Sequence, residues 1–435
     1  MTDPVLASPQ RRGACPGLSV PMATGDGLLV RLLPIGTIAL DAFAGLCAAA
    51  RRHGNGIIEV TSRGSIQIRG LSAASAPCFA SAISALGIAA GDGIPVLTDQ
   101  LAGLALDDII DAAALAADLR VALAQGSLAQ RLSAKISVTI DGGGALNLDD
   151  VAGDVRLRAE TVNGTAAFCT SVGGDGRSAA PLGCIAGRDT VEFVTRLLEI
   201  IARRERHTRA RDIVAAEGIA AFRPAVEDLL VAFAGPRLRE NARKEPIGVH
   251  PLRDGTFAHG VGLAFSHADA MSLQRLAEAA KAAGARGMRA APGRTLMIIG
   301  LTQQTVSSFA AAAEALGFIV RADDPRRHVI ACAGAPICAS ADIAARALAP
   351  QIAAAAAPHL DGAFKIHISG CAKGCALPAP AALTVVGTAS GCALVANGST
   401  RDAPFKIVTT NELPAAIAEN ARRLKHEDDQ EIRNV

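Results

Sequence analysis

The chain has 435 residues, of which 50% are hydrophobic and 19% are charged, and its net charge is +2. This length and apolar content suit about three folded domains and exclude a disordered chain. The small charge and the absence of Trp and Tyr argue against a nucleic-acid partner. No apolar run reaches the roughly 18–20 residues of a membrane helix, and the N-terminus lacks an apolar signal core. We therefore predict a cytoplasmic protein without nucleic-acid or membrane contacts.

The first predicted elements form two units. After an irregular arm at 1–18, residues 19–90 contain an apolar strand at 28–33, an amphipathic helix at 40–52 and a second apolar strand at 57–68. Residues 91–239 form a larger α/β unit, with amphipathic helices at 107–125 and 189–204 and a buried strand at 136–140. The charged stretch at 203–211 is expected to lead out of this unit.

The pattern then repeats at a constant offset, so that 27–71 corresponds to 257–301. The same offset places Lys135 on Lys365, and Asp154 on Thr384. The second copy is predicted at 247–320 and 321–424, after a linker at 240–246 and before a frayed polar tail. The fold class is thus α+β, with two pseudo-symmetric copies of one module.

Four cysteines in the second copy carry the strongest chemical signal. They are spaced Cys332-x5-Cys338 and Cys371-x3-Cys375, and the long segment 339–370 separates the two pairs. Four thiolates from two loops suit an iron–sulfur cluster, and Gly370 and Gly374 would let main-chain amides face the sulfurs. Structural zinc is an alternative, although its cysteine pairs are usually spaced by about two to four residues, and unrelated buried thiols are another. At the constant offset Asp141 takes the position of Cys371, so only the second copy is predicted to hold metal.

The other cysteines and the nearby histidines receive no role. Ten cysteines in a chain without an export signal indicate reduced thiols rather than a disulfide framework. His328 and His367 precede the cysteine pairs and are interpreted as packed or surface imidazoles. The cysteines without a pairing pattern are Cys15, Cys47, Cys78, Cys169, Cys184 and Cys392.

A duplicated module with these spacings resembles the nitrite and sulfite reductase family. The matching stretches are 30–34, 60–70, 331–338 and 369–375, and they anchor nearly the whole chain. The resemblance implies that each copy combines a ferredoxin-like half-domain with a reductase-like α/β domain. It also implies a 4Fe-4S cluster on Cys332, Cys338, Cys371 and Cys375. In the reductases, the residue matched by Cys375 also bridges to the iron of sirohaem.

The chain departs from the reductases in a way that resembles one branch of the family. Ser137 replaces the second lysine of the reductase Lys-x-Lys segment that begins at Lys135, and leucines follow Arg31 where the reductases have another arginine. The segments 11–31 and 369–376 look like the precorrin-3B synthase branch, which belongs to cobalamin biosynthesis. This resemblance implies hydroxylation of precorrin-3A at C20 and γ-lactone formation, with dioxygen and reducing equivalents. It further implies a mononuclear non-haem iron and no sirohaem, but no 2-His-1-carboxylate spacing identifies the iron ligands.

A polycarboxylate tetrapyrrole needs fixed cations, and arginine suits them because its planar fork pairs two carboxylate oxygens. Two arginines six residues apart on an extended chain, Arg63 and Arg69, could share one face. Lys373 and Lys365 are predicted to tune the cluster, and no catalytic residue is identified. The residues predicted to bind the substrate are Arg31, Arg63, Gln67, Arg69 and Lys135.

No dinucleotide-binding signature is present, because the glycine-rich segment 173–176 is expected to lack both a preceding strand and a phosphate-facing helix start, and is predicted to be a loop. Electrons are therefore expected from an external reductase or ferredoxin. Two alternative functions stay open. One is a sirohaem-dependent assimilatory sulfite or nitrite reductase, and the other is a non-catalytic tetrapyrrole carrier or electron-transfer subunit.

Overall fold

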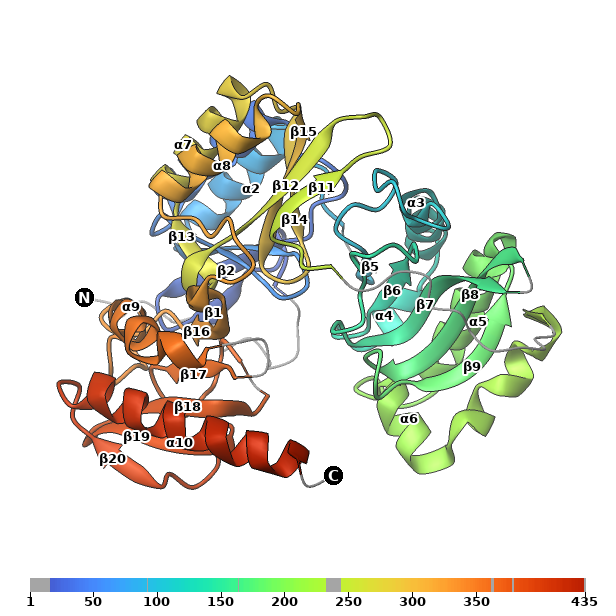
Figure 1. Cartoon of the computed structure of the whole chain (residues 1–435). Coiled ribbons are helices and arrows are strands. Elements are labelled where there is room, and N and C mark those ends of the chain that lie inside the picture. Colours follow the sequence, from blue (N-terminus) through green and yellow to red (C-terminus); the bar gives the residue numbers. More distant parts are fainter. Residues whose placement is uncertain are drawn as a thin grey trace, which may run out of the picture.

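The computed structural model describes residues 16–91, 93–162, 164–231, 244–360, 364–377 and 379–433. Four sheets are present in these ranges, with five, six, four and five strands. Figure 1 shows three bodies: the two half-domains together, the α/β domain of the first copy, and the α/β domain of the second.

The first half-domain is a strand–helix–strand unit whose inner face is apolar. Val30, Leu32, Ile66 and Ile68 alternate with polar residues and are buried on the helix side of the sheet. The strand order is β1-β2-β4-β3, and the edge of β3 is occupied by β13 from the second copy. The elements are β1 (Met22–Thr24), β2 (Gly27–Leu32), α1 (Leu40–His53), β3 (Ile57–Val60), β4 (Ile66–Leu71) and α2 (Ser75–Ala85).

The second half-domain repeats this unit in the order β11-β12-β15-β14. Its β12 begins at Phe257, the residue that the sequence repeat matches to the first residue of β2, Gly27. The elements are β11 (Gly248–Pro251), β12 (Phe257–Gly262), the 3-10 helix η5 (Ala264–Ser266), β13 (His267–Asp269), α7 (Ala270–Ala282), β14 (Gly287–Ala291), β15 (Thr295–Leu301) and α8 (Val306–Ala315).

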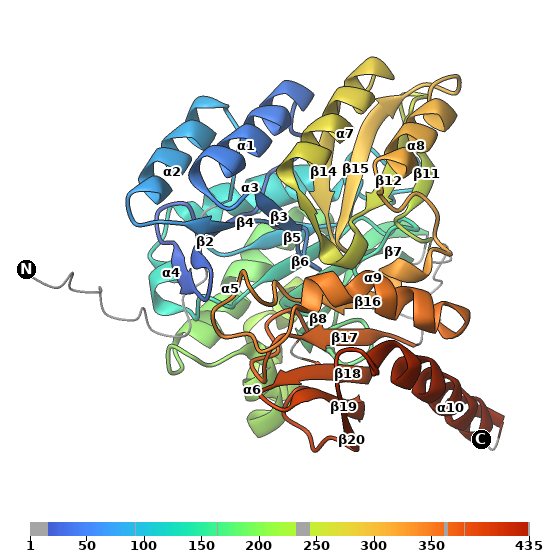
Figure 2. The same ribbon diagram turned by 90° about the vertical axis from the view of Figure 1, so that its left-hand side faces the viewer.

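The two half-domains share one hydrophobic core. Helix α1 packs against α7, and one cluster of buried residues includes Phe43 and Phe79 from the first copy with Leu273 and Phe309 from the second. Strand β13 pairs antiparallel with β3, with Ala268 opposite Ile58. Figure 2 shows α1, α2, α7 and α8 on the same outer side of this body, so its other sheet faces are turned toward the α/β domains.

The α/β domain of the first copy has a six-stranded sheet in the order β10-β9-β8-β7-β6-β5. Strands β5, β6 and β7 are parallel, and the others pair antiparallel. The elements are β5 (Val96–Thr98), α3 (Ala112–Ala124), α4 (Leu128–Arg131), β6 (Val138–Asp141), β7 (Gly153–Val162), β8 (Thr165–Gly174), β9 (Ala180–Ile185), η1 (Gly187–Asp189), α5 (Thr190–Ala202), α6 (Ala210–Glu217), η2 (Ile219–Ala221), η3 (Arg223–Ala225), η4 (Glu227–Leu229) and β10 (Leu230–Val231).

The α/β domain of the second copy has the same design, with parallel β16, β17 and β18 followed by antiparallel strands. Helices α9 and α10 pack against each other, and buried residues of both join the core of this sheet. The elements are η6 (Pro325–His328), β16 (Val329–Ala331), α9 (Ala345–Ala356), η7 (Ala357–His359), β17 (Ile366–Ser369), β18 (Ala381–Thr388), β19 (Gly391–Gly398), β20 (Lys406–Val408) and α10 (Leu413–Arg433).

The predicted fold class, with two pseudo-symmetric copies of one module, is confirmed, but several details were wrong. The apolar stretch at 57–68 is not one strand, because a turn divides it into β3 and β4. The segment 173–176 does follow a strand, since β8 continues to Gly174. Helix α3 begins at Ala112 rather than 107, because the Asp111 side chain caps it by accepting from the N–H groups of Ala113 and Ala114. The chain does not leave the first copy at 203–211, since Arg209 pairs with buried Asp154 and the chain continues to β10. Helix α10 continues to Arg433 instead of fraying after residue 424, through a stretch rich in good helix formers.

The constant offset was also wrong, because it fails inside the α/β domains. The residue-number offset between equivalent strands β6, which starts at Val138, and β17, which starts at Ile366, is smaller than the offset between the half-domains. From the start of β5 at Val96 to that of β16 at Val329 it is larger. Loops of different length between equivalent strands cause this drift. The strand register therefore aligns Asp141 with Ser369, and not with Cys371 as predicted.

Candidate functional site

The four cysteines of the second copy meet at one edge of its sheet. Cys332 directly follows β16, and Cys371 follows β17 by two residues. Because β16 and β17 are neighbouring parallel strands, the loops after them start side by side. The N–H of Gly370 donates to Sγ of Cys332 at 3.0 Å, which joins the two loops and confirms the predicted amide–sulfur contact for Gly370 but not for Gly374.

The cysteines also influence one another's acidity. Burial raises the pKa of Cys332, the neighbouring Cys338 and Cys371 raise it further, and the N–H groups of Gly370 and Gly334 oppose this rise. Burial likewise raises the pKa of Cys375, with contributions from Cys332 and Cys371. All four thiols therefore lie within electrostatic reach of one another.

A turn from the first half-domain closes over this group. A Cβ atom on Gly25, between β1 and β2, would lie 2.5 Å from Sγ of Cys338, so only glycine allows this approach. The N–H of Ala339 donates to the carbonyl of Gly25 at 2.9 Å. The thiols thus sit between a half-domain of one copy and the α/β domain of the other.

These thiols fit a multi-iron cluster. No three His, Cys, Asp or Glu side chains within the described ranges lie close enough to share a single metal ion. A cluster does not need such convergence, because each thiolate bonds to a different iron, whereas the ligands of one zinc all lie about 2.3 Å from the same ion. Donation from main-chain amides to sulfur, as from Gly370 to Cys332, stabilises thiolate charge.

A buried chain of ion pairs borders the thiols. Arg69 on β4 forms a two-pronged pair with Asp26, from Nε at 2.8 Å and Nη2 at 2.7 Å, and its Nη1 lies 3.7 Å from Glu59. Arg346, in the first turn of α9, donates to Glu59 at 3.3 Å. The Asp26 side chain is only 2% exposed and that of Arg69 13%. The chain of charges connects the first half-domain to the helix behind the cysteine loops.

The pKa shifts show how tightly these charges are held. Burial disfavours the ionised form of Asp26, but the hydrogen bonds and charge of Arg69 outweigh it and lower the Asp26 pKa. Burial disfavours the charged form of Arg69 as well, yet Asp26, Glu59 and the nearby Cys338 raise its pKa. Arg69 therefore stays charged beside the thiols.

The residues predicted to bind substrate occupy two places. Arg31 on β2, Gln67 on β4 and Glu59 on β3 form one cross-strand row, and Arg69 is two residues beyond Gln67 on the same face. This polar face is opposite the helix-covered apolar face. Arg31, Gln67 and Arg69 are therefore brought together beside the cysteine site.

Arg63 and Lys135 lie at the second place. Arg63 is in the turn before β4, and its guanidinium donates to Oγ of Ser137 at 3.3 Å and to the carbonyl of Ala152 at 3.1 Å. Lys135 is exposed and lies two residues before Ser137. Arg63 and Arg69 thus lie at opposite ends of β4 rather than on one extended face, because the chain turns at 61–64.

The two lysines predicted to tune the cluster differ in position. Nζ of Lys373 donates to Oγ of Ser340 at 2.9 Å, so it joins the loop of Cys371 and Cys375 to the loop of Cys338. Lys365 is exposed at the start of β17, and the whole strand separates it from Cys371. The structure therefore brings Lys373, but not Lys365, to the thiols.

Sequence reasoning missed Arg294. It has a left-handed backbone (φ 62°) in the turn between β14 and β15, and it donates to the carbonyl of Ala376, next to Cys375, at 3.2 Å. Burial lowers the pKa of Arg294, and Glu59 opposes this effect. At the constant offset its counterpart is Gly64, so the repeat gave no reason to single it out.

His367 is fully buried on β17, and neither ring nitrogen has a hydrogen-bond partner among the residues that the structure describes. Burial, assisted by Arg294, lowers its pKa to about 4, so the imidazole is neutral at physiological pH. Cys15, which received no role from the sequence, lies outside the described residues.

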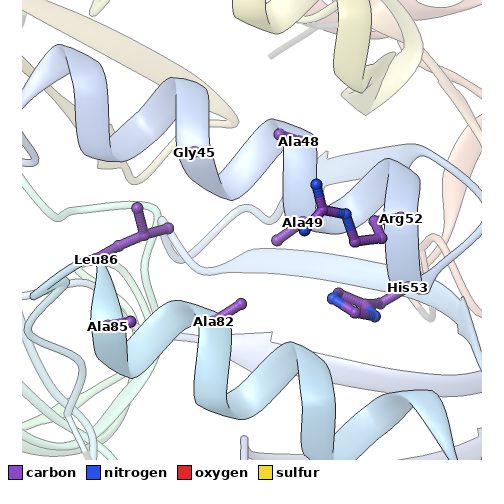
Figure 3. Close-up of a pocket in the computed structure, with 8 residues that line it drawn as sticks. All are labelled: Gly45, Ala48, Ala49, Arg52, His53, Ala82, Ala85 and Leu86. Atoms are coloured by element: carbon purple, nitrogen blue, oxygen red, sulfur yellow. The ribbon is translucent and has the colours of Figure 1, made fainter.

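Two cavities lie away from the thiols. A groove of about 260 Å³ runs between α1 and α2, where Leu86 packs on Gly45 and His53 lines one end (Figure 3). A smaller cavity of about 130 Å³ lies beside β5 and is lined in part by Arg63, Arg120 and Arg289.

The comparisons with known proteins agree with this architecture. Residues 20–86 match the nitrite/sulfite reductase ferredoxin-like half domain. The chain is 38% identical over 428 residues to precorrin-3B synthase of a Sinorhizobium species, covering 98% of this chain and 92% of the relative. The chain belongs to the precorrin-3B synthase family. It is therefore an oxidoreductase of that type, and the relationship supports a role in cobalamin biosynthesis.

More distant relatives connect this family to the reductases. The chain is 24% identical over 395 residues to ferredoxin–nitrite reductase of Synechococcus elongatus, covering 84% of this chain and 77% of that protein. The solved structure of the NirA protein of Mycobacterium tuberculosis superimposes with a TM-score of 0.69 at 20% identity, covering 92% of this chain and 81% of the other. That likeness shows the shared fold. No helix in the described part of the chain is long and apolar enough to cross a membrane.

Proposed function

We propose that this precorrin-3B synthase family member converts precorrin-3A to precorrin-3B, by hydroxylation at C20 and closure of a γ-lactone with dioxygen and reducing equivalents. The observation that carries the proposal is the 38% identity to precorrin-3B synthase over 98% of the chain. The grouping of four thiols beside a polar sheet face supports a redox reaction on a large anionic substrate at that place.

Cys332, Cys338, Cys371 and Cys375 are the proposed ligands of a 4Fe-4S cluster. When bound, such a cluster supplies one-electron transfer. The N–H of Gly370 stabilises thiolate charge at Cys332, and the buried positive charges of Arg69 and Arg294 oppose the build-up of negative charge at the site. The turn at Gly25 packs closely against Cys338 and leaves no room for a larger side chain between them.

The substrate is proposed to lie on the polar face formed by β2, β4 and β3. Arg31 and Gln67 would bind acetate and propionate groups there, and Arg69, whose guanidinium is already held by Asp26, would contribute mainly charge. At the other end of β4, Ser137 and Ala152 fix the direction of the Arg63 guanidinium, and Lys135 adds a second cation. Because these cations are already held in place, less side-chain conformational entropy is lost when the substrate binds.

The electrons are proposed to come from an external reductase or ferredoxin. A mononuclear non-haem iron belongs to the same proposal, but its ligands are not assigned, since no tight set of three ligating side chains occurs in the described ranges.

The decisive experiment combines spectroscopy with turnover. Protein purified without oxygen is analysed for iron, sulfide and visible absorption, and is then mixed with precorrin-3A, dioxygen and a reductant. We expect a broad cluster absorption without porphyrinoid bands, and a product that has gained one oxygen atom. Sharp sirohaem bands with sulfite or nitrite reduction would establish the reductase alternative. Failure to turn over precorrin-3A in cluster-loaded protein with a working electron donor would favour the carrier or electron-transfer alternative.

A further inference from the structure

A second sulfur pair lies in the α/β domain of the first copy, on a different sheet from the four thiols discussed above. Cys169 on β8 and Cys184 on β9 are direct cross-strand partners, and their Sγ atoms are 2.8 Å apart. We propose that Cys169 and Cys184 form a reversible disulfide, with a peroxide or a low-molecular-weight disulfide as the oxidant. This inference does not depend on the proposed reaction.

The backbone already satisfies the demands of the bond. Directly opposite residues of antiparallel strands have Cα atoms about 4.5–5.5 Å apart, which lies within the disulfide range of about 4.4–6.8 Å. The sulfurs must approach from 2.8 Å to about 2.0 Å, a movement that small changes in side-chain torsion supply. Neither strand has to move.

The environment of the pair separates it from the other cysteines. Cys169 and Cys184 form a small buried cluster with Val162 and Ala167. Cys169 is 8% exposed and Cys184 is 2% exposed. The remaining cysteines in the described ranges that lie outside the four-thiol site are on other elements: Cys47 on α1, Cys78 on α2 and Cys392 on β19. Cys169 and Cys184 therefore have each other as the natural partners for oxidation.

The chemistry also indicates how the pair behaves at rest. The neighbouring Cys184 thiol, burial and the nearby Glu160 all raise the pKa of Cys169. Cys169 is thus a thiol at neutral pH, and because the thiolate is the reactive form, oxidation should be slow near pH 7 and faster at higher pH.

The balance of the reaction is simple. With a peroxide, two S–H bonds and the O–O bond break, one S–S bond forms, and two waters leave when the oxidant is hydrogen peroxide. The two thiols supply the two electrons. With a low-molecular-weight disulfide, exchange through a mixed disulfide releases two small thiols. A thiol reductant reduces the disulfide formed by either route, and this breaks the covalent link between β8 and β9.

Peptide mapping of the full-length protein tests the proposal. Protein is treated with hydrogen peroxide, or separately with oxidised glutathione, alkylated in denaturant, cleaved with trypsin and analysed by mass spectrometry. Cys169 falls in the tryptic peptide 159–177 and Cys184 in 178–188, so the disulfide links two separate peptides. We expect the linked pair in the wild type and in Cys78→Ser, its formation to accelerate from pH 7 to pH 9, and its loss with dithiothreitol or in Cys184→Ser.

Two results would overturn the inference. One is full alkylation of Cys169 and Cys184 at an oxidant dose that has already oxidised the exposed Cys78. The other is a linkage of Cys169 to any cysteine other than Cys184. Because mass spectrometry identifies each linked peptide pair separately, disulfides formed among the four thiols after cluster loss are not mistaken for the Cys169–Cys184 disulfide.

Discussion

Asp99 in the first copy accepts a hydrogen bond from the N–H of Gly142 at 3.1 Å, as Cys332 in the second copy accepts one from the N–H of Gly370 at 3.0 Å. The strand registers make the two positions equivalent. Val96 pairs with Val138 in the first copy and Val329 pairs with Ile366 in the second, and Asp99 and Cys332 each directly follow the first of these strands. A carboxylate thus stands where the second copy has a proposed cluster ligand.

This relationship shows how the duplicated module has diverged. Oδ1 of Asp99 accepts from the N–H of Leu101, so the carboxylate satisfies main-chain donors on both sides of the loop. Burial, together with Asp108 and Asp141, raises the pKa of Asp99 well above its usual value. The first copy therefore has the same hydrogen-bonded loop geometry as the proposed ligand site, with the Asp99 side chain in place of the cysteine.

Loss of the cluster is the first prediction. Replacing Cys371 or Cys375 with serine should abolish the broad visible absorption and remove most of the bound iron and sulfide, because serine cannot supply a thiolate. Cys78→Ser, at an exposed cysteine on α2, is the matched control and should keep both. Full retention of iron and sulfide in the Cys371 and Cys375 variants would contradict the ligand assignment.

The sequence predicted the half-domain copies well because their strands and helices keep one offset and a clear apolar alternation. It misaligned the α/β domains because loops of unequal length separate β5 from β6 and β16 from β17, so that Asp141 was matched to the wrong residue. The four cysteines could be found because their spacing is chemically specific. Arg294, Arg346 and Glu59 could not, since each is an ordinary charged residue until the two copies pack and bring it beside the thiols.

The second prediction concerns the buried pair of Asp26 and Arg69. Asp26→Asn removes the partner of a mostly buried guanidinium, so the free energy of unfolding should fall by about 3 kcal/mol. Thermal or urea unfolding measures this loss. Asp41→Asn is the control, because its pair with Lys281 also joins the two copies but is exposed, and it should cost less than about 1 kcal/mol. Equal small losses in both variants would show that the buried pair is not a structural tie.

The same pair predicts a pH dependence. Because the pKa of Asp26 in the folded protein is lowered from 3.8, its contribution is fully present above the unfolded value and is lost as the pH falls through the lower, folded value. Unfolding measured between pH 6 and pH 3 should therefore show a smaller acid-induced loss of stability in Asp26→Asn than in the wild type. A parallel dependence in the two proteins would contradict the lowered pKa.

The third prediction addresses substrate binding by Arg63. Arg63→Ala should raise the KM for precorrin-3A about tenfold or more, since a hydrogen bond to a charged group contributes about 1.5–3 kcal/mol. Arg63→Lys should recover part of the loss, because it restores the charge but not the planar fork. Arg188→Ala, at an arginine with an 84% exposed side chain, should leave KM unchanged. If Arg63→Ala lowers thermal stability and leaves KM at the wild-type value, the contacts with Ser137 and Ala152 are purely structural.

The fourth prediction concerns the potential of the cluster. Arg294 places a buried positive charge next to Cys375, and such a charge favours the more negative, reduced form of the cluster. Arg294→Gly removes this charge while keeping a residue that accepts the left-handed backbone, so the variant should fold and its midpoint potential should become more negative. Arg188→Ala again serves as the control for loss of a distant surface charge, and potentiometric titration followed by electron paramagnetic resonance measures both. A potential equal to that of the wild type, in a variant that retains full iron and sulfide, would show that the Arg294 charge is compensated by Glu59 and does not reach the cluster.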